Sequence, residues 1–166
     1  MAEKLKKIAS FTIDHDVLTS GLYLSRVDGD CRTYDLRMRT PNAGDYLPLG
    51  ALHTLEHLLA TFLRSGPRSD EVVYVGPMGC RTGFYVILRD SVSAGDAIAL
   101  LRDAFAFAAD FQGPVPGARR VECGNYRAHD LPGARREAAA YLEVLRRCTP
   151  QTMEYPKRET PDGTGT

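Results

Sequence analysis

The chain has 166 residues, of which 43% are hydrophobic and 25% are charged, and its 21 basic residues balance its 21 acidic ones. This composition is typical of one globular domain with a sizeable core. The balanced charge excludes the basic surface expected of a nucleic-acid or anionic-membrane partner. No apolar run approaches the roughly 18 residues that span a bilayer, and the charged residues 1–7 lack the apolar stretch of a signal peptide. We therefore expect a cytoplasmic protein whose four cysteines are ligands, catalysts or buried thiols instead of disulfides.

Two strands joined by a tight turn are the first elements that the sequence predicts. Residues 21–27 have the character of a strand and end at residues 28–30, whose Asp-Gly pair favours a hairpin. Residues 32–39 alternate, with aromatic and aliphatic side chains on one face and charged ones, such as Asp35 and Arg37, on the other.

A helix that carries a metal-binding pattern is predicted for residues 49–63. Residues four apart share a helix face, so His53 and His57 can bind one metal ion together. Glu56 lies beside that face, close enough to move protons without binding the metal. The apolar flanks of the motif predict that the helix is buried. The order His-x-x-Glu-His is the inverse of the zincin motif, so a peptidase of the inverted class is one alternative.

Two further strands and two further helices follow the histidine helix. Residues 71–75 and 82–88 have the pattern of strands, and the loop between them contains Cys80. Ser93 is the expected N-cap of the second helix. A third helix is predicted from about residue 134 to 148, on the basis of its apolar stripe.

These elements predict an α+β fold, a single domain in which an antiparallel sheet is packed with helices. The domain is expected to cover residues 1–148. Residues 149–166 are rich in proline, threonine and glycine, and they are predicted to form a disordered C-terminal tail.

The two histidines require a third donor, because catalytic metal sites commonly have three protein ligands and one open position. Cys123, beside a glycine in a turn-like segment, is the best candidate, and a small buried thiol is an equal alternative for it. Cys80 is either a reactive thiolate stabilised by a nearby cation or a loop thiol without a role. A non-catalytic alternative is a closed zinc site formed by His53, His57, Cys80 and Cys123.

Three blocks of the sequence resemble the signatures of one enzyme family. They are His53–Ala60, Pro77–Tyr85 and Glu122–Tyr126, and shorter fragments at residues 11–15 and 34–37 match as well. In their order and spacing the blocks resemble the S-ribosylhomocysteine lyase (LuxS) family over roughly residues 8–147. The resemblance implies an α+β homodimer with two active sites at the subunit interface.

The activity that the resemblance implies is that of a metal-dependent carbon–sulfur lyase. Such an enzyme cleaves S-ribosylhomocysteine into homocysteine and 4,5-dihydroxy-2,3-pentanedione, the autoinducer-2 precursor. The reaction belongs to the activated methyl cycle and to autoinducer-2 synthesis for quorum sensing. The family binds one divalent ion per subunit, natively iron(II) with zinc or cobalt as substitutes. By resemblance the ligands here are His53, His57 and Cys123.

The substrate carries its thioether on C5 of an aldose, so two isomerisations must move the carbonyl to C3 before a β-elimination can occur. Proton shuttles are therefore needed on different carbons, and the resemblance assigns them to Cys80 and Glu56. It places Ser10, His15 and Arg37 in the substrate pocket. The alternatives for these three are a surface hydroxyl, a solvated histidine and a charge on a strand face.

Two further positions bear on the site. His129 follows the third block, and we interpret it as structural. Tyr74 departs from the family pattern, in which an aspartate that contacts substrate usually stands at this position. The departure affects the polar contacts at one edge of the pocket and leaves the metal ligands and proton shuttles in place.

Overall fold

A four-stranded antiparallel sheet forms the centre of the molecule in the computed structural model, which describes residues 5–159 of the chain. Its strands, in spatial order, are β1 (Gly21–Asp28), β2 (Cys31–Arg37), β4 (Gly83–Arg89) and β3 (Val72–Pro77). The turn between β1 and β2 contains Gly29 at a φ of 59°, a left-handed conformation that glycine adopts without strain. The sequence-predicted hairpin therefore forms. On β2, Leu36 lies opposite Leu22 of β1 and Phe84 of β4.

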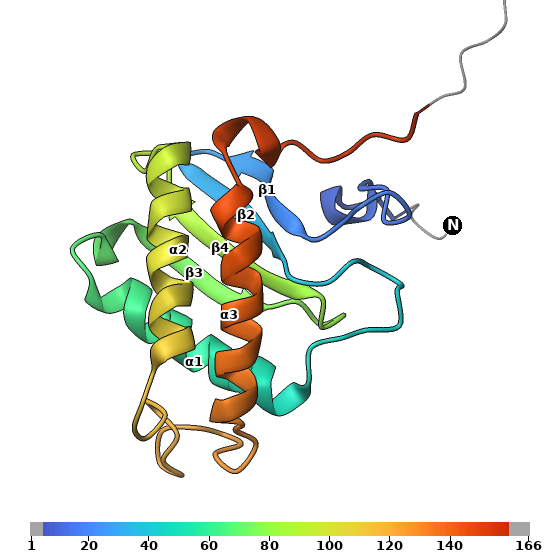
Figure 1. Cartoon of the computed structure of the whole chain (residues 1–166). Coiled ribbons are helices and arrows are strands. Elements are labelled where there is room, and N and C mark those ends of the chain that lie inside the picture. Colours follow the sequence, from blue (N-terminus) through green and yellow to red (C-terminus); the bar gives the residue numbers. More distant parts are fainter. Residues whose placement is uncertain (1–4, 160–166) are drawn as a thin grey trace, which may run out of the picture.

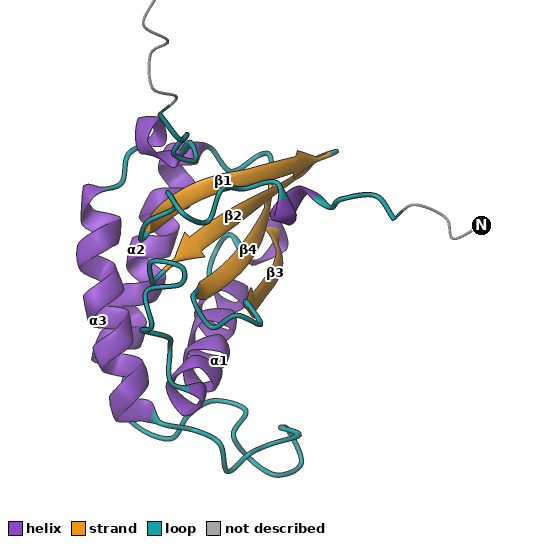
Figure 2. Cartoon of the chain, turned by 90° about the vertical axis from the view of Figure 1, so that its right-hand side faces the viewer, coloured by secondary structure: helices purple, strands orange, loops and turns teal. Residues whose placement is uncertain are grey.

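Three helices cover one face of the sheet (Figures 1 and 2). They are α1 (Leu49–Ser65), α2 (Ala94–Asp110) and α3 (Leu131–Arg147). Short 3-10 helices are η1 (Ala9–Phe11), η2 (Ser69–Glu71) and η3 (Pro150–Met153). No helix in the described part of the chain is both long and apolar enough to cross a membrane. The α+β prediction, a single domain with an antiparallel sheet packed by helices, is confirmed.

The hydrophobic core lies between the three helices and the covered face of the sheet. Its fully buried side chains come from all these elements, and they include Leu22, Leu36, Phe84, Val86, Leu55, Leu58, Leu59, Leu101, Phe105 and Leu145. Complete burial of such a side chain contributes about 1.5–3 kcal/mol relative to exposure. The apolar flanks of the His-x-x-Glu-His motif thus hold α1 against the sheet, and the motif is carried on a firmly packed helix.

The starts of α2 and α3 are set by capping side chains. Ser93 accepts a hydrogen bond from the backbone of Asp96 at 3.1 Å, as the sequence predicts. Asp130 accepts one from the backbone of Gly133 at 2.9 Å, so α3 begins at Leu131, earlier than the predicted residue 134. A proline in the first turn is compatible with this early start, because its missing N–H would be unpaired there anyway.

The C-terminal segment, residues 149–159, packs on the domain after α3. Met153 is buried, and the ring of Tyr155 stacks on that of Tyr23 with a centroid distance of 5.0 Å. Arg158 forms ion pairs with Asp14 and Asp16. This part of the sequence-predicted tail is therefore folded against the sheet, because its aromatic and apolar side chains have partners there. Residues 160–166 of the predicted tail lie outside the described residues.

Candidate functional site

Three histidines and one cysteine converge beside α1 and form what we call the metal group. It consists of His53, His57, Cys123 and His129, whose ligand atoms all lie within 4.8 Å of one another. The Cys123 Sγ is 3.5 Å from His53 Nε2 and 3.9 Å from His129 Nε2. Nitrogen and sulfur ligands around a tetrahedral divalent ion are roughly 3.3–3.8 Å apart. The Cys123–His53 spacing lies in this range, and the four donors gathered within 4.8 Å are a group that could hold one metal ion.

The two histidines of α1 are oriented by backbone carbonyls of the segment that connects α2 and α3. His53 Nδ1 donates to the Ala128 carbonyl at 2.9 Å, and His57 Nδ1 donates to the Pro116 carbonyl at 2.7 Å. With Nδ1 protonated, each imidazole presents the lone pair of Nε2 to the site. Gly117, at a φ of 69°, lets this loop approach closely, since a Cβ there would lie 3.1 Å from the His57 ring.

His129 is held in the same tautomer by Thr54. The Thr54 hydroxyl donates to the Gly50 carbonyl at 2.9 Å and accepts from the Asp130 backbone at 2.9 Å. Its remaining lone pair faces His129 Nδ1 at 3.2 Å, so that nitrogen carries the proton. Burial, and then the charges of His53 and His57, lower the pKa of His129 and favour its neutral, ligating form.

The interpretation of His129 as merely structural is corrected by this geometry. Its ring stacks on that of His53 at a centroid distance of 4.0 Å. A signal was available in the sequence, because the chain has only four histidines and His129 lies six residues after the predicted ligand Cys123. Glu56 stands on α1 next to His57 and is partly exposed. The metal group contains no carboxylate, which disfavours the inverted-peptidase alternative, since that class normally uses one as its third ligand.

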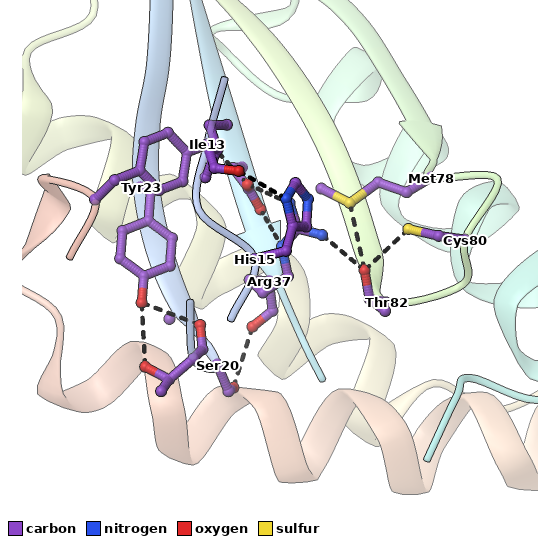
Figure 3. Close-up of polar contacts among 12 residues, drawn as sticks. Ile13, His15, Ser20, Tyr23, Arg37, Met78, Cys80 and Thr82 are labelled. Atoms are coloured by element: carbon purple, nitrogen blue, oxygen red, sulfur yellow. Dashed lines mark hydrogen bonds and ion pairs between the residues drawn. The ribbon is translucent and has the colours of Figure 1, made fainter. Parts of the chain in front are cut away.

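Cys80 lies in a second site, which we call the thiol pocket. This cavity of about 390 Å³ is lined by Cys80 and by Ser10, His15, Arg37 and Tyr85, together with Phe11 and the loop residues 77–79. The structure thus gathers the three residues expected to bind substrate around the exposed Cys80. His15 Nδ1 bonds the Ile13 carbonyl at 2.9 Å, which fixes its ring (Figure 3).

Arg37 and its partner Asp35 are buried, although the alternating pattern of β2 predicts both on an outer face. Only 2% of Arg37 and 0% of Asp35 are exposed. Burial opposes the charge of Arg37, but the hydrogen bonds and charge of Asp35 raise its pKa above the ordinary value. Arg37 Nη1 donates to Thr82 Oγ1 at 2.7 Å, and that hydroxyl is 3.1 Å from Cys80 Sγ (Figure 3). A permanent cation is therefore linked to the thiol.

The loop that carries Cys80 is shaped by its backbone. Arg81 has a φ of 59°, and its N–H donates to the Met78 carbonyl at 2.9 Å. Nearby, Tyr74 is 49% exposed and lines a neighbouring cavity that shares Ser10 and Tyr85 with the thiol pocket. A phenol, that of Tyr74, thus stands at the edge of the site.

The described residues of the chain form two separate sites. The side chains that line the thiol pocket include none of the four residues of the metal group. The closed zinc site that would include Cys80 is therefore not formed, and His129 stands in the group in its place. An α+β domain with a three-histidine, one-cysteine metal group, a helical glutamate and an exposed thiol in a pocket defines a metal-dependent enzyme.

Comparisons with known proteins agree with this class. The model of the S-ribosylhomocysteinase (LuxS) family matches residues 8–151, so the chain belongs to that family. It is 49% identical to the S-ribosylhomocysteine lyase of Phocaeicola vulgatus, over 93% of this chain and 100% of that protein. It is 46% identical to the enzyme of the same name from Desulfotalea psychrophila, over 92% of this chain and 99% of that protein.

Proposed function

We propose that the chain is an S-ribosylhomocysteine lyase, which cleaves S-ribosylhomocysteine into homocysteine and 4,5-dihydroxy-2,3-pentanedione. Family membership and the names of its relatives support this activity. The observation that carries the proposal is the gathering of Cys80, Ser10, His15 and Arg37 around one cavity in a chain that also has the metal group. The product is the precursor of autoinducer-2, so the same proposal places the enzyme in the activated methyl cycle and in quorum sensing.

We assign one divalent ion per subunit to His53, His57 and Cys123, with iron(II) as the native ion and zinc or cobalt as substitutes. When bound, the ion supplies Lewis acidity toward the oxygens on which negative charge develops. The protein's own part is to hold the two histidine ligands by fixed Nδ1 contacts and by the packing of α1, with Cys123 supplied by the segment between α2 and α3. His129 is the fourth member of the group, and its displacement or retention decides whether a position is open to substrate.

Cys80 and Glu56 are the proposed proton carriers. Each isomerisation removes a proton from one carbon and returns it to its neighbour, and we assign these transfers to the Cys80 thiolate. In the elimination a base removes the proton from C4 while the C5–S bond breaks and the homocysteine thiolate leaves. We assign this step to Glu56, whose carboxylate stands beside a metal ligand. Ser10, His15 and Arg37 are proposed to hold the substrate's polar groups.

A homodimer with shared active sites is part of the proposal. A complete site requires both the metal group and the thiol pocket, and within one subunit these two do not share a lining. Helices α1, α2 and α3 lie on one side of the sheet (Figure 2), and in the described part of the chain the N-terminal segment and Tyr155 pack against the other side. The large hydrophobic side chain of Phe11 lines the thiol pocket and is 67% exposed. We infer that the partner's metal group faces this pocket.

Incubation of the metal-loaded protein with S-ribosylhomocysteine tests the activity. Homocysteine is measured with a thiol reagent, and the pentanedione is measured by mass spectrometry after derivatisation. Both products are expected in equal amounts, and Cys80→Ala serves as the matched inactive control. Absence of thiol release by a protein that retains its metal and its fold would contradict the proposed function.

A further inference from the structure

A continuous run of hydrogen bonds connects the C-terminal segment with Cys80. The Tyr155 hydroxyl donates to Asp35 Oδ2 at 2.7 Å. Asp35 accepts two bonds from Arg37, from Nε at 3.0 Å and from Nη2 at 2.6 Å. Arg37 Nη1 donates to Thr82 Oγ1, which contacts Cys80 Sγ (Figure 3). Each member therefore touches the next, from a segment after α3 to the thiol between β3 and β4.

The direction of the protons along this run follows from the chemistry of its members. Burial, and then the negative charge of Asp35, raise the pKa of Tyr155, so its hydroxyl stays protonated and donates. Arg37 has only donors to offer, so Thr82 Oγ1 accepts from it. The Thr82 proton has two sulfur atoms in reach, Met78 Sδ at 3.8 Å and Cys80 Sγ at 3.1 Å, and a thiolate at Cys80 can only accept it. The run thus ends in a hydroxyl that can donate a hydrogen bond to the Cys80 sulfur.

Tyr155 matters because Asp35 competes with Thr82 for the same cation. Asp35 is fully buried, so its carboxylate depends on the donors that the protein supplies. Tyr155 donates one of the hydrogen bonds that Asp35 Oδ2 accepts, and the Tyr155 ring is fixed by its stack on Tyr23. Without the Tyr155 hydroxyl, the hydrogen bonds and ion pair between Asp35 and Arg37 must become stronger. The cation would then be neutralised more fully and would hold Thr82 less firmly.

We infer that Tyr155 is a positioning residue for Cys80, acting through Asp35, Arg37 and Thr82. The inference rests on the proposed function only in assigning a catalytic role to Cys80. Tyr155 lies beyond residue 151, the last residue that the family model matches. The titratable and charged groups that share the thiol pocket with Cys80 are His15 from the N-terminal segment, Arg37 from β2 and Tyr85 from β4. Among them, the Arg37 cation is the group that the run connects to the sulfur.

The reactivity of the thiol tests the inference without any use of substrate. The full metal-loaded chain is treated with iodoacetamide at a series of pH values, and alkylation of Cys80 is followed by peptide mass mapping. Tyr155→Phe removes one hydroxyl and keeps the stacked ring. We expect its Cys80 to react roughly three- to tenfold more slowly at neutral pH, with the profile displaced to higher pH. Thr82→Val should show a larger loss, and Thr82→Ser, which restores the hydroxyl, should recover the wild-type profile.

Tyr23→Phe is the matched control, because it removes a hydroxyl from the same stacked pair. That hydroxyl donates to the Thr19 carbonyl and has no part in the run. An equal loss of reactivity in Tyr23→Phe and Tyr155→Phe, or a wild-type profile in Tyr155→Phe, would overturn the inference. If Tyr155→Phe does not fold, a wild-type profile in Thr82→Val overturns it equally. A wild-type protein that reacts normally with iodoacetamide but releases no homocysteine would instead contradict the proposed function.

Discussion

Each histidine of the metal group is committed to one tautomer by a contact outside the group. Carbonyls fix His53 and His57. His129 is fixed by the Thr54 hydroxyl, whose only proton is already donated to the Gly50 carbonyl, so it can only accept from His129. All three therefore present Nε2 toward Cys123 without rearrangement. Such preorganisation fixes which nitrogen of each ring faces the site and lowers the cost of binding the ion.

Loss of the cysteine ligand should remove the ion. Cys123→Ala is expected to bind the metal at least tenfold more weakly, because a thiolate that both supplies charge and completes three ligands is gone. Metal content after dialysis, measured by elemental analysis, provides the test. Cys31→Ala, which changes a cysteine outside the group, should keep its full complement of metal. Equal metal retention by both variants would show that Cys123 is not a ligand.

His129→Ala distinguishes a three-ligand site from a four-ligand one. If three residues suffice, this variant should keep one ion per subunit, with an affinity within about tenfold of the wild type. The metal-to-protein ratio and the affinity in a chelator competition decide the matter. A loss as large as that of Cys123→Ala would make His129 the fourth ligand and would require it to leave before substrate binds.

Substitution of either proposed proton carrier should lower turnover without affecting metal binding. Cys80→Ala and Glu56→Gln keep all four members of the metal group, so both are expected to retain the ion. Their turnover should fall by about 10²–10⁴-fold, which is the usual contribution of a general acid or base. Steady-state release of homocysteine and metal analysis of the same samples measure both effects. Turnover of Cys80→Ala close to that of the wild type would remove the thiol from the mechanism.

At the scale of elements, the starts of α1 and α3 lie against each other and thereby build the metal group. The Asp130 backbone donates to the Thr54 hydroxyl of α1, and its carboxylate caps α3. Glycines permit the approach, since a Cβ at position 50 would lie 3.1 Å from that of Asp130. The cap of α3 therefore fixes both the helix and the neighbouring His129.

Removing this cap should affect both stability and metal binding. Asp130→Ala is expected to lower the free energy of unfolding by about 1 kcal/mol and to weaken metal binding severalfold. Ser93→Ala removes the N-cap of α2, where Ser93 bonds Asp96, and serves as the matched control. It should cost similar stability in denaturant unfolding but leave metal affinity unchanged. Identical metal affinities in the two variants would show that the Asp130 cap of α3 does not contribute to metal binding.

Local patterns in the sequence predicted the strands, the Ser93 cap and the shared face of His53 and His57. These features depend on near neighbours, so spacing and capping chemistry suffice. His129 was missed because its place depends on Thr54, which is 75 residues away in the chain. The burial of Asp35 and Arg37 was missed for a similar reason. Alternation on β2 predicts that the charged face is exposed. That face is buried by Tyr155 and the N-terminal segment, which are distant in the sequence.

At the scale of the whole molecule, subunit mixing tests the shared site. Cys80→Ala and His57→Ala damage different halves, so a mixed dimer should contain one intact site. Random mixing of equal amounts is expected to restore roughly a quarter of the wild-type activity. Cys80→Ala mixed with His15→Ala is the control, because both residues line the same pocket of one subunit. No recovery in the first mixture, or equal recovery in both, would argue against the shared site.

The C-terminal segment has a consequence for how a shortened version of the protein would be chosen. A chain cut at the border of the family match would end at residue 151. It would keep the sheet, the three helices and both sites, yet it would lose Tyr155 and the ion pairs that connect Arg158 with Asp14 and Asp16. Asp35 would then be open to water, and the N-terminal segment that carries Ser10 and His15 would lose its tether. Truncation at the end of the family match would thus remove contacts that hold the thiol pocket together. The activity measured for such a truncated protein would be that of a less rigid pocket.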